Sequence, residues 1–265
     1  MMISKSVPAT PQISTLWWRF AILVVVPLVI LIGLLIWGRI PQDLDYHRFA
    51  DTRTFLGISN FWDVFSNLPF LTIGIWGVWF CLWNPLGPSQ SAWTVFFVGV
   101  ALISFGSAYY HLNPNNDTLV WDRLSMTIAF MSLLTAVFGD YVDQRLAIML
   151  VPAVLLGLSS VLYWSQVDDL RLYLWLQIIT LLNIALIMIL FRSVYSNNLV
   201  MGLALLSYVL AVVTEQTDRC IFELTDEIVS GHTIKHLLAA AGSYCVLLLL
   251  QKRKPANTRQ AEPQP

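Results

Sequence analysis

Charged residues are scarce in this sequence. Only 12% of its 265 residues are Asp, Glu, Lys or Arg, whereas 57% are hydrophobic, and the mean hydropathy is +0.68. These values lie outside the usual range for a soluble globular domain and are typical of an integral membrane protein. The formal net charge is -1, so the chain has no excess of positive charge and we expect no nucleic-acid partner.

Cysteine is scarce as well. Cys81, Cys220 and Cys245 are far apart, two of them lie in apolar runs, and no C-x-x-C spacing occurs. The pattern indicates neither a disulfide framework nor a thiolate metal site. We interpret the three as small, buried hydrophobic residues.

Long apolar runs are what the sequence has instead, separated by short connections that turn residues mark. Each run is long enough to cross about 30 Å of hydrocarbon. The expected spans are eight in number, at about 16–40, 61–83, 91–112, 119–138, 146–164, 172–191, 199–217 and 232–250. The predicted fold is therefore all-α, a polytopic membrane helix bundle.

The first run is interpreted as a retained N-terminal anchor. Trp17, Trp18 and Trp37 lie near its ends, where aromatic residues anchor helices at the membrane interface. A cleaved signal peptide is the alternative, but the run is longer than a typical signal core and no small-residue cleavage site follows it. We divide the chain into a cytoplasmic tip and anchor at 1–40, the main helical domain at 41–250, and a basic tail at 251–265 that we expect to be disordered.

The charge distribution predicts the orientation. The tail carries Lys252, Arg253, Lys254 and Arg259, so the positive-inside rule places it in the cytoplasm, and eight spans then place the N-terminus there too. The polar segment 41–60 falls on the outer (periplasmic or lumenal) side. Five polar side chains are predicted near the same face, namely Ser107, His111, Asp122, His232 and His236.

Histidines at the ends of the predicted spans indicate a metal site. His232 and His236 are four residues apart, so on a helix both imidazoles project from one face. His111 supplies a third nitrogen if the third and last spans pack side by side. Three imidazoles with an open fourth position are typical of catalytic zinc, although nitrogen ligation also leaves iron, nickel or cobalt open.

Two further polar residues can reach the same pocket. Asp122 follows His111 across a short Asn-Pro loop and is suited to act as a general base, unless Arg123 and the helix N-terminus simply balance its charge. Ser107 lies one helical turn before His111, near enough to hydrogen-bond a water or a developing oxyanion. The alternative for Ser107 is a bond to its own helix backbone.

With these residues in place, the sequence resembles the alkaline ceramidase family, membrane hydrolases in a superfamily shared with the adiponectin and progestin receptors. The family motif is a serine four residues before a histidine, then an aspartate, then His-x-x-x-His in the last helix, and all of its positions match. The segment YYHLNPNNDTLVWDRLSMT is also more similar to the ceramidase branch than to the receptor branch. The resemblance covers about Asp45 to Leu250, a seven-helix core, and leaves the first helix as an addition.

The resemblance implies a zinc-dependent hydrolase of linear amides that belongs to sphingolipid metabolism. In the family, three histidines bind zinc, the aspartate activates water and the serine assists at the scissile amide. A ceramide-like lipid would enter from the bilayer, and water would cleave it to a fatty acid and a long-chain amino alcohol. No protein partner is implied.

The family also has a calcium site before its first core helix, for which Asp45, Asp51 and Asn60 are the candidate ligands here. The spacing departs from that of the animal enzymes, and His47, Asp51 and Arg53 forming an ion-pair cap is the alternative. Besides Arg123, the candidates for supporting a ligating histidine are Glu215 and Asp218, which are equally compatible with a solvated loop.

Two rival functions remain at this stage. One is a zinc-containing seven-helix receptor or regulator of the adiponectin-receptor type with little hydrolysis, which would place its zinc toward the cytoplasm. The other is a transporter with proton- or metal-carrying histidines, which predicts inverted repeats that the sequence lacks.

Overall fold

In the computed structural model, residues 17–191 and 198–253 are described. Over these ranges the chain is helical and forms no β-strand. Eight helical segments are long and apolar enough to cross a membrane, at 17–37, 61–83, 87–112, 116–141, 144–167, 171–190, 199–216 and 231–252. The predicted all-α membrane bundle is confirmed, while the tail from 254 onward and residues 1–16 lie outside the described residues.

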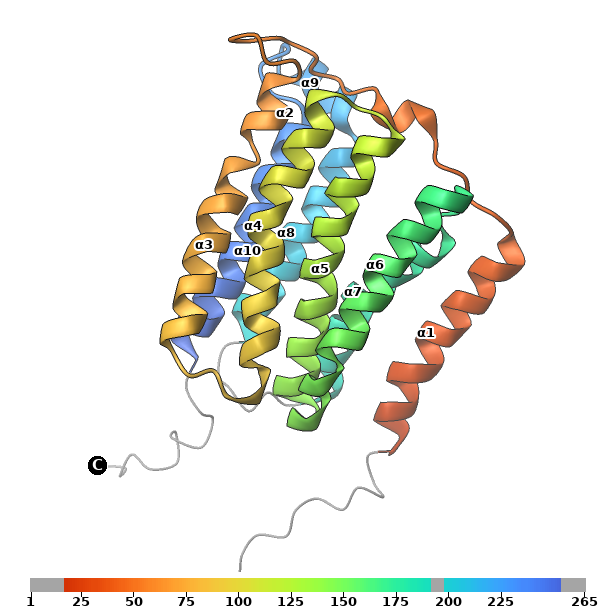
Figure 1. The fold of residues 1–265 in the computed structure, drawn as a ribbon, viewed down its shortest axis with the longest axis vertical. Helices are drawn as coiled ribbons and strands as arrows, with labels where there is room; N and C mark the ends of the chain where they lie inside the picture. The colour runs from red at the N-terminus through yellow and green to blue at the C-terminus, as the bar shows by residue number, and fades with distance from the viewer. Residues whose placement is uncertain (1–16, 192–197, 254–265) are drawn as a thin grey trace, which may run out of the picture.

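The long helices run side by side, and short helical turns connect several of them (Figure 1). Their bounds are α1 (Trp17–Trp37), α2 (Phe61–Phe65), α3 (Leu68–Trp83), α4 (Gln90–Leu112), α5 (Asn116–Tyr141), α6 (Leu150–Val167), α7 (Arg171–Leu190), α8 (Asn198–Gln216), α9 (Asp218–Leu224) and α10 (Gly231–Lys252). Three 3-10 helices complete the described elements, η2 (Leu44–His47), η3 (Gly87–Ser89) and η4 (Gln144–Met149).

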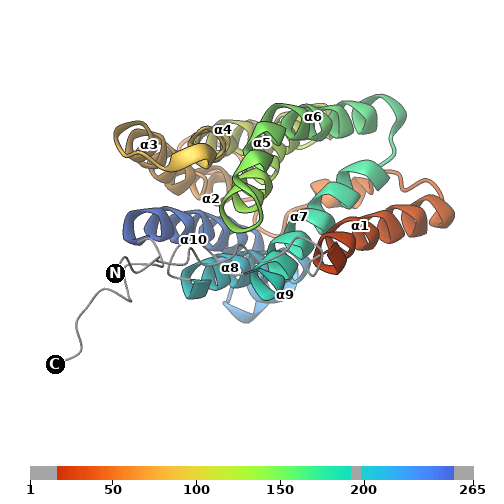
Figure 2. The same ribbon diagram turned by 90° about the horizontal axis from the view of Figure 1, so that it is seen from below.

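Six helices form a closed ring in the order α3, α4, α5, α7, α8, α10, in which each packs against the next and α10 returns to α3 (Figure 2). Helix α6 packs outside the ring against α5 and α7, and α1 packs against α7 at the edge of the molecule. Trp175 of α7 donates a hydrogen bond to the Pro27 carbonyl of α1 at 2.8 Å. The described part of α1 is thus an addition to the ring.

The span at 61–83 is broken. Helix α2 ends at Phe65, and α3 begins at Leu68, with Pro69 in its first turn, where a proline does not cost a helical hydrogen bond. The break leaves Ser66 and Asn67 as connecting residues buried among the helices. Ser66 lies at this break and contacts His236 of the site described below.

Two glycines let α4 and α5 approach closely. A Cβ atom on Gly99 would lie 2.6 Å from the Ala129 backbone nitrogen, and one on Gly106 would lie 2.5 Å from the Trp121 carbonyl oxygen. Only glycine fits such contacts without moving a backbone. Gly106 therefore brings the two helices together at the level of Ser107 and Asp122.

Candidate metal centre and cavity

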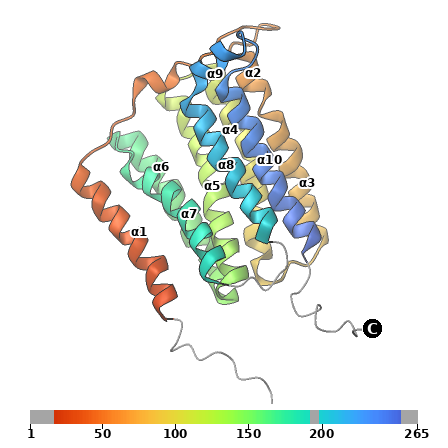
Figure 3. The same ribbon diagram turned by 180° about the vertical axis from the view of Figure 1, so that it is seen from behind.

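Three histidines meet near one end of the ring, close to the short α2 and α9 helices and far from the described end of α10 (Figure 3). His111 lies in the last turn of α4, and His232 and His236 lie in the first turns of α10. One ligand atom from each can be chosen so that all lie within 4.8 Å of one another, and all three side chains are buried. This group can hold a metal ion.

The donor set fits zinc. The Nε2 atoms of His111 and His232 are 3.3 Å apart, and two nitrogens bound at about 2.0–2.1 Å in a tetrahedral zinc site are about 3.3–3.4 Å apart. The ring centroids of the three imidazoles are 4.8 to 5.0 Å apart, and Phe49 packs on His111 and His232 with ring centroids at 4.6 and 4.8 Å. The phenyl ring covers the group on one side and keeps it in an apolar environment.

The broken second span orients His236. The Nδ1 atom of His236 is 2.8 Å from the Ser66 hydroxyl oxygen, and the His236 ring also hydrogen-bonds the Asp63 backbone. The Ser66 hydroxyl itself reaches that carbonyl at 3.2 Å, so it can accept from the imidazole and donate to the backbone. This arrangement favours a proton on Nδ1 and leaves the lone pair of Nε2 free for a metal. His111 Nδ1, by contrast, has no hydrogen-bond partner among the described residues.

The start of α10 is fixed by caps on both sides of His232. The Ser230 hydroxyl accepts from the Thr233 backbone N–H at 3.0 Å, and the Asp218 carboxylate accepts from the His232 backbone N–H at 2.8 Å. The carboxylate of Asp218 also accepts from the Ala50 N–H at 2.9 Å. Asp218 therefore supports the backbone that carries His232, and its contacts described here are with backbone N–H groups.

A cavity of about 370 Å³ opens beside the histidines. Ser107, Asp122 and His236 all line it, and the Ser107 hydroxyl hydrogen-bonds the Asp122 carboxylate. Both side chains are buried. The cavity wall thus presents a carboxylate, a hydroxyl and one imidazole of the histidine group, which are groups capable of acid–base chemistry.

A second polar group lines the same cavity next to Asp122. The Lys235 ammonium pairs with the Glu215 carboxylate, which also accepts a hydrogen bond from the Tyr46 hydroxyl at 3.1 Å. Burial and the adjacent Glu215 carboxylate raise the pKa of the Tyr46 phenol well above its usual value, so the phenol remains a donor. Glu215 thus contacts Lys235 and Tyr46 and makes no contact with a histidine ring among the described interactions.

Sequence analysis did not single out Lys235 or Ser66. A lysine inside an apolar span is a strong functional signal, and Lys235 could have been found by it. Ser66 carried no such signal, because serine is common in membrane helices. Counting apolar residues along the span also does not reveal the helix break at that position.

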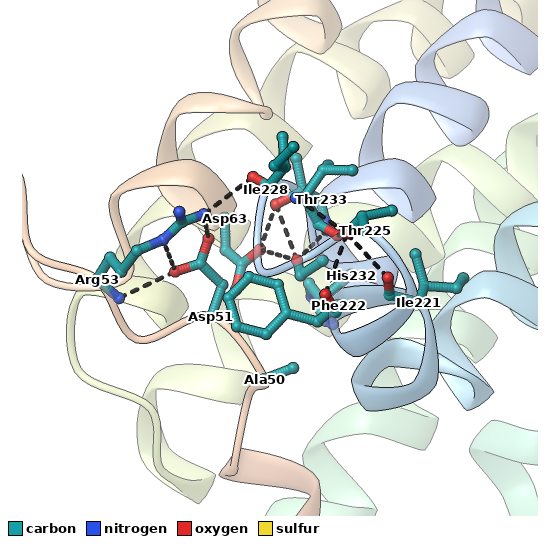
Figure 4. A network of polar contacts seen from close by, with 12 residues as sticks. Ala50, Asp51, Arg53, Asp63, Ile221, Phe222, Thr225, Ile228, His232 and Thr233 are labelled. Atoms are coloured by element: carbon teal, nitrogen blue, oxygen red, sulfur yellow. Dashed lines mark hydrogen bonds and ion pairs between the residues drawn. The ribbon is translucent and has the colours of Figure 1, made fainter.

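The segment between α1 and α2 covers the histidine end and is held down by an ion pair (Figure 4). Arg53 donates to both Asp51 oxygens at 2.8 and 2.5 Å, and also to the Ile228 carbonyl at 3.0 Å. These hydrogen bonds to Asp51 raise the pKa of the Arg53 guanidinium. The pair ties this segment to the connection between α9 and α10, as the cap alternative predicts, whereas His47 instead contacts Tyr110 and Asn116, each at 2.9 Å.

Each of the three calcium candidates contacts a different group of the protein. Asp45 forms an exposed ion pair with Arg48 at 3.0 Å, Asp51 is engaged by Arg53, and the Asn60 amide donates to the His111 carbonyl at 2.8 Å. The histidine trio is the only such group of potential metal ligands found among the described residues. Calcium at these positions stays a prediction from sequence.

A helical membrane bundle with a buried trio of histidines beside a cavity is a membrane protein that can hold a metal ion among its helices. The sequence model of the ceramidase family matches residues 54–264, most of the chain, and the chain therefore belongs to the ceramidase family. Among curated proteins, no significant match was found. The family assignment makes the chain a membrane hydrolase of lipid amides, in agreement with the resemblance of its motifs.

Proposed function

We propose that this protein is a zinc-dependent intramembrane amidase that cleaves N-acyl sphingoid lipids into a fatty acid and a long-chain base. The observation that carries the proposal is the convergence of His111, His232 and His236 within the bundle, where one ligand atom from each lies within 4.8 Å of the others. The ceramidase match favours hydrolysis over the receptor alternative.

The three imidazoles would hold the ion, and a zinc ion there supplies Lewis acidity toward the amide carbonyl and toward water. Asp122 takes a proton from the attacking water as the new C–O bond forms at the carbonyl carbon. Once protonated, the Asp122 carboxyl group is a weaker hydrogen-bond acceptor. The Ser107 hydroxyl can then donate its hydrogen bond to the oxyanion instead. As the C–N bond breaks, Asp122 returns its proton to the departing amine nitrogen.

The cavity provides the acyl-chain site in this proposal. Away from the histidines its lining is mainly apolar, and it extends along the inner faces of α4, α5, α8 and α10. The lining on α10 runs from residue 235 to residue 246, which corresponds to about 16 Å at 1.5 Å per residue. A lipid chain lying along this axis would bring its amide to Ser107 and Asp122.

We also propose that the anchor at 1–40 and the tail at 251–265 flank a catalytic domain at 41–250, with both termini cytoplasmic and the site toward the outer face. The described start of α1 and the described end of α10 lie at the same end of the bundle, opposite the histidines (Figures 1 and 3). The basic tail supports placing that end in the cytoplasm.

Incubation of the purified protein with an N-acylsphingosine tests the function. We expect wild-type protein to release fatty acid, and both His232→Ala and Asp122→Asn to lower kcat/KM by about 100-fold or more, the usual size of an acid–base contribution. Zinc content should fall in His232→Ala and persist in Asp122→Asn. The control Asp143→Asn changes an exposed carboxylate near η4 and should leave release unchanged. Undiminished release in both site variants would rule the mechanism out.

A further inference from the structure

Arg123 is a buried cation that interacts electrostatically with the adjacent Asp122 carboxylate but, among the described residues, forms no close ion pair with it. Its side chain is 6% exposed, and its Nη2 donates to the Gln42 amide oxygen at 2.6 Å. Within the described residues its Nη1 has no hydrogen-bond partner, and it forms no ion pair with a carboxylate. Buried charged groups in proteins are ordinarily hydrogen-bonded as well as paired, so the free Nη1 donor of this guanidinium points to a hydrogen-bond acceptor supplied by a bound ligand.

Aromatic rings hold this guanidinium in place. Its central carbon lies 4.0 Å from the ring centroid of Trp164, 4.8 Å from that of Tyr173 and 5.8 Å from that of Tyr46. The rings exclude water and restrict the side chain, both of which strengthen a charge-assisted hydrogen bond to an anion. An arginine fixed in this way is suited to forked binding of a carboxylate or phosphate.

Arg123 lines the same cavity as the proposed catalytic groups, next to Asp122 on α5. The other cation of the cavity wall, Lys235, is already paired with Glu215. The apolar end of the cavity is lined by Phe96, Val100, Leu133, Met201 and Val246. An acyl chain in that end places the amide at Asp122 and the amine part of the lipid beside Arg123, beneath Gln42 and Tyr46.

We propose that, among the lipid amides it cleaves, this protein prefers those that carry an anionic oxygen group, a carboxylate or a phosphate, on the amine side of the amide bond, and that Arg123 binds this group. The inference rests on the proposed amidase function and names its substrate class. It assigns Arg123 to substrate binding, while Ser107 and Asp122 act on the amide itself.

Two matched pairs of lipids test the proposal on the purified, zinc-loaded protein. N-palmitoylserine is compared with N-palmitoylserinol, in which a hydroxymethyl group replaces the carboxylate, and N-palmitoylethanolamine phosphate is compared with N-palmitoylethanolamine. We expect wild-type kcat/KM to be about 10- to 100-fold higher for the anionic member of at least one pair, the size of a hydrogen bond to a charged group. Which pair shows the preference distinguishes carboxylate from phosphate.

Arg123→Gln should bring that ratio close to one, mainly through a higher KM for the anionic lipid. Arg123→Lys keeps the charge but not the fork and should give an intermediate ratio. The control Arg48→Gln removes an exposed arginine whose partner is Asp45, and it should keep the wild-type ratio. If Arg123→Gln does not fold, the kcat/KM ratios of the wild-type protein and of Arg123→Lys test the inference.

A wild-type preference for the neutral lipids would overturn the inference. An equal loss of kcat/KM on both members of a pair in the Arg123 variants would overturn it as well, because a purely structural role of Arg123 predicts that result. Cleavage of N-acylsphingosine without cleavage of any of the four test lipids would overturn it too and leave the amidase function standing. Failure to cleave N-acylsphingosine as well would remove both.

Discussion

At the scale of single residues, the orientation of one proposed metal ligand depends on a hydroxyl group at the break between α2 and α3. Ser66 is the side-chain partner of His236 Nδ1 and fixes which imidazole nitrogen faces the other two histidines. Removing such a partner of a metal ligand typically costs about 10- to 100-fold in metal affinity. We therefore expect Ser66→Ala to weaken zinc binding by that factor, measured by competition with a chromogenic chelator. Ser132→Ala is the matched control, because the buried Ser132 hydroxyl bonds only to the Ile128 carbonyl of its own helix at 2.7 Å. Equal affinity in the two variants would contradict the role of Ser66.

The buried pair of Lys235 and Glu215 gives a second prediction at this scale. Both side chains are less than a fifth exposed, at 16% and 18%. Removing one partner of a buried ion pair costs about 3–5 kcal/mol, because the other charge stays buried without compensation. Lys235→Met should therefore lower the free energy of unfolding in detergent by about that amount, and Glu215→Gln should restore most of it in the double variant. If the losses in free energy of unfolding of the two single variants simply add in the double variant, the two side chains are not energetically coupled.

Much of the site could be anticipated at this scale because membrane proteins rarely place polar groups in their spans. His111, His232, Asp122 and Ser107 drew attention for that reason, and the structure brings them to one end of the bundle. The contacts of Asp218 could not be anticipated, since they go to backbone N–H groups whose positions depend on the short α9 helix. Partner choice among polar groups is a property of tertiary packing, which a single sequence does not contain.

At the scale of helices, the spans followed from apolar runs because length and hydrophobicity alone decide whether a segment can cross a bilayer. Two structural features could not be predicted from the apolar runs. The division of the second span into α2 and α3 leaves its composition unchanged, and α9 is too short to produce an apolar run. Both elements surround the histidines, so the least predictable part of the fold is the part that builds the site.

The contact between α4 and α5 carries the prediction at the helix scale. Gly106 lies against the Trp121 carbonyl, adjacent in sequence to the hydrogen-bonded Ser107 and Asp122. Gly106→Ala should force the two helices apart, cost about 1–3 kcal/mol of stability as other overpacking changes do, and lower amidase activity by separating the hydroxyl from the carboxylate. Gly202→Ala is the control, since a Cβ there meets no atom within 4 Å. If both variants unfold at the same temperature and retain full activity, the close approach is not required.

At the scale of the whole molecule, the proposal depends on which side of the membrane the histidine end faces. Cys220 in α9 is exposed and lies at that end, so the prediction that all three cysteines are buried is wrong for it, whereas Cys81 is buried and Cys245 is partly buried. A membrane-impermeant maleimide added to intact cells should therefore label the wild-type protein, and Cys220→Ser should lose the label. In the Cys220→Ser background, Arg145→Cys places a thiol in η4 at the other end of the bundle, and we expect labelling there only after permeabilisation. The opposite pattern would place the cavity entrance and its catalytic groups toward the cytoplasm, which is the arrangement expected of the receptor branch, and would remove the charge-based argument for an outward-facing amidase.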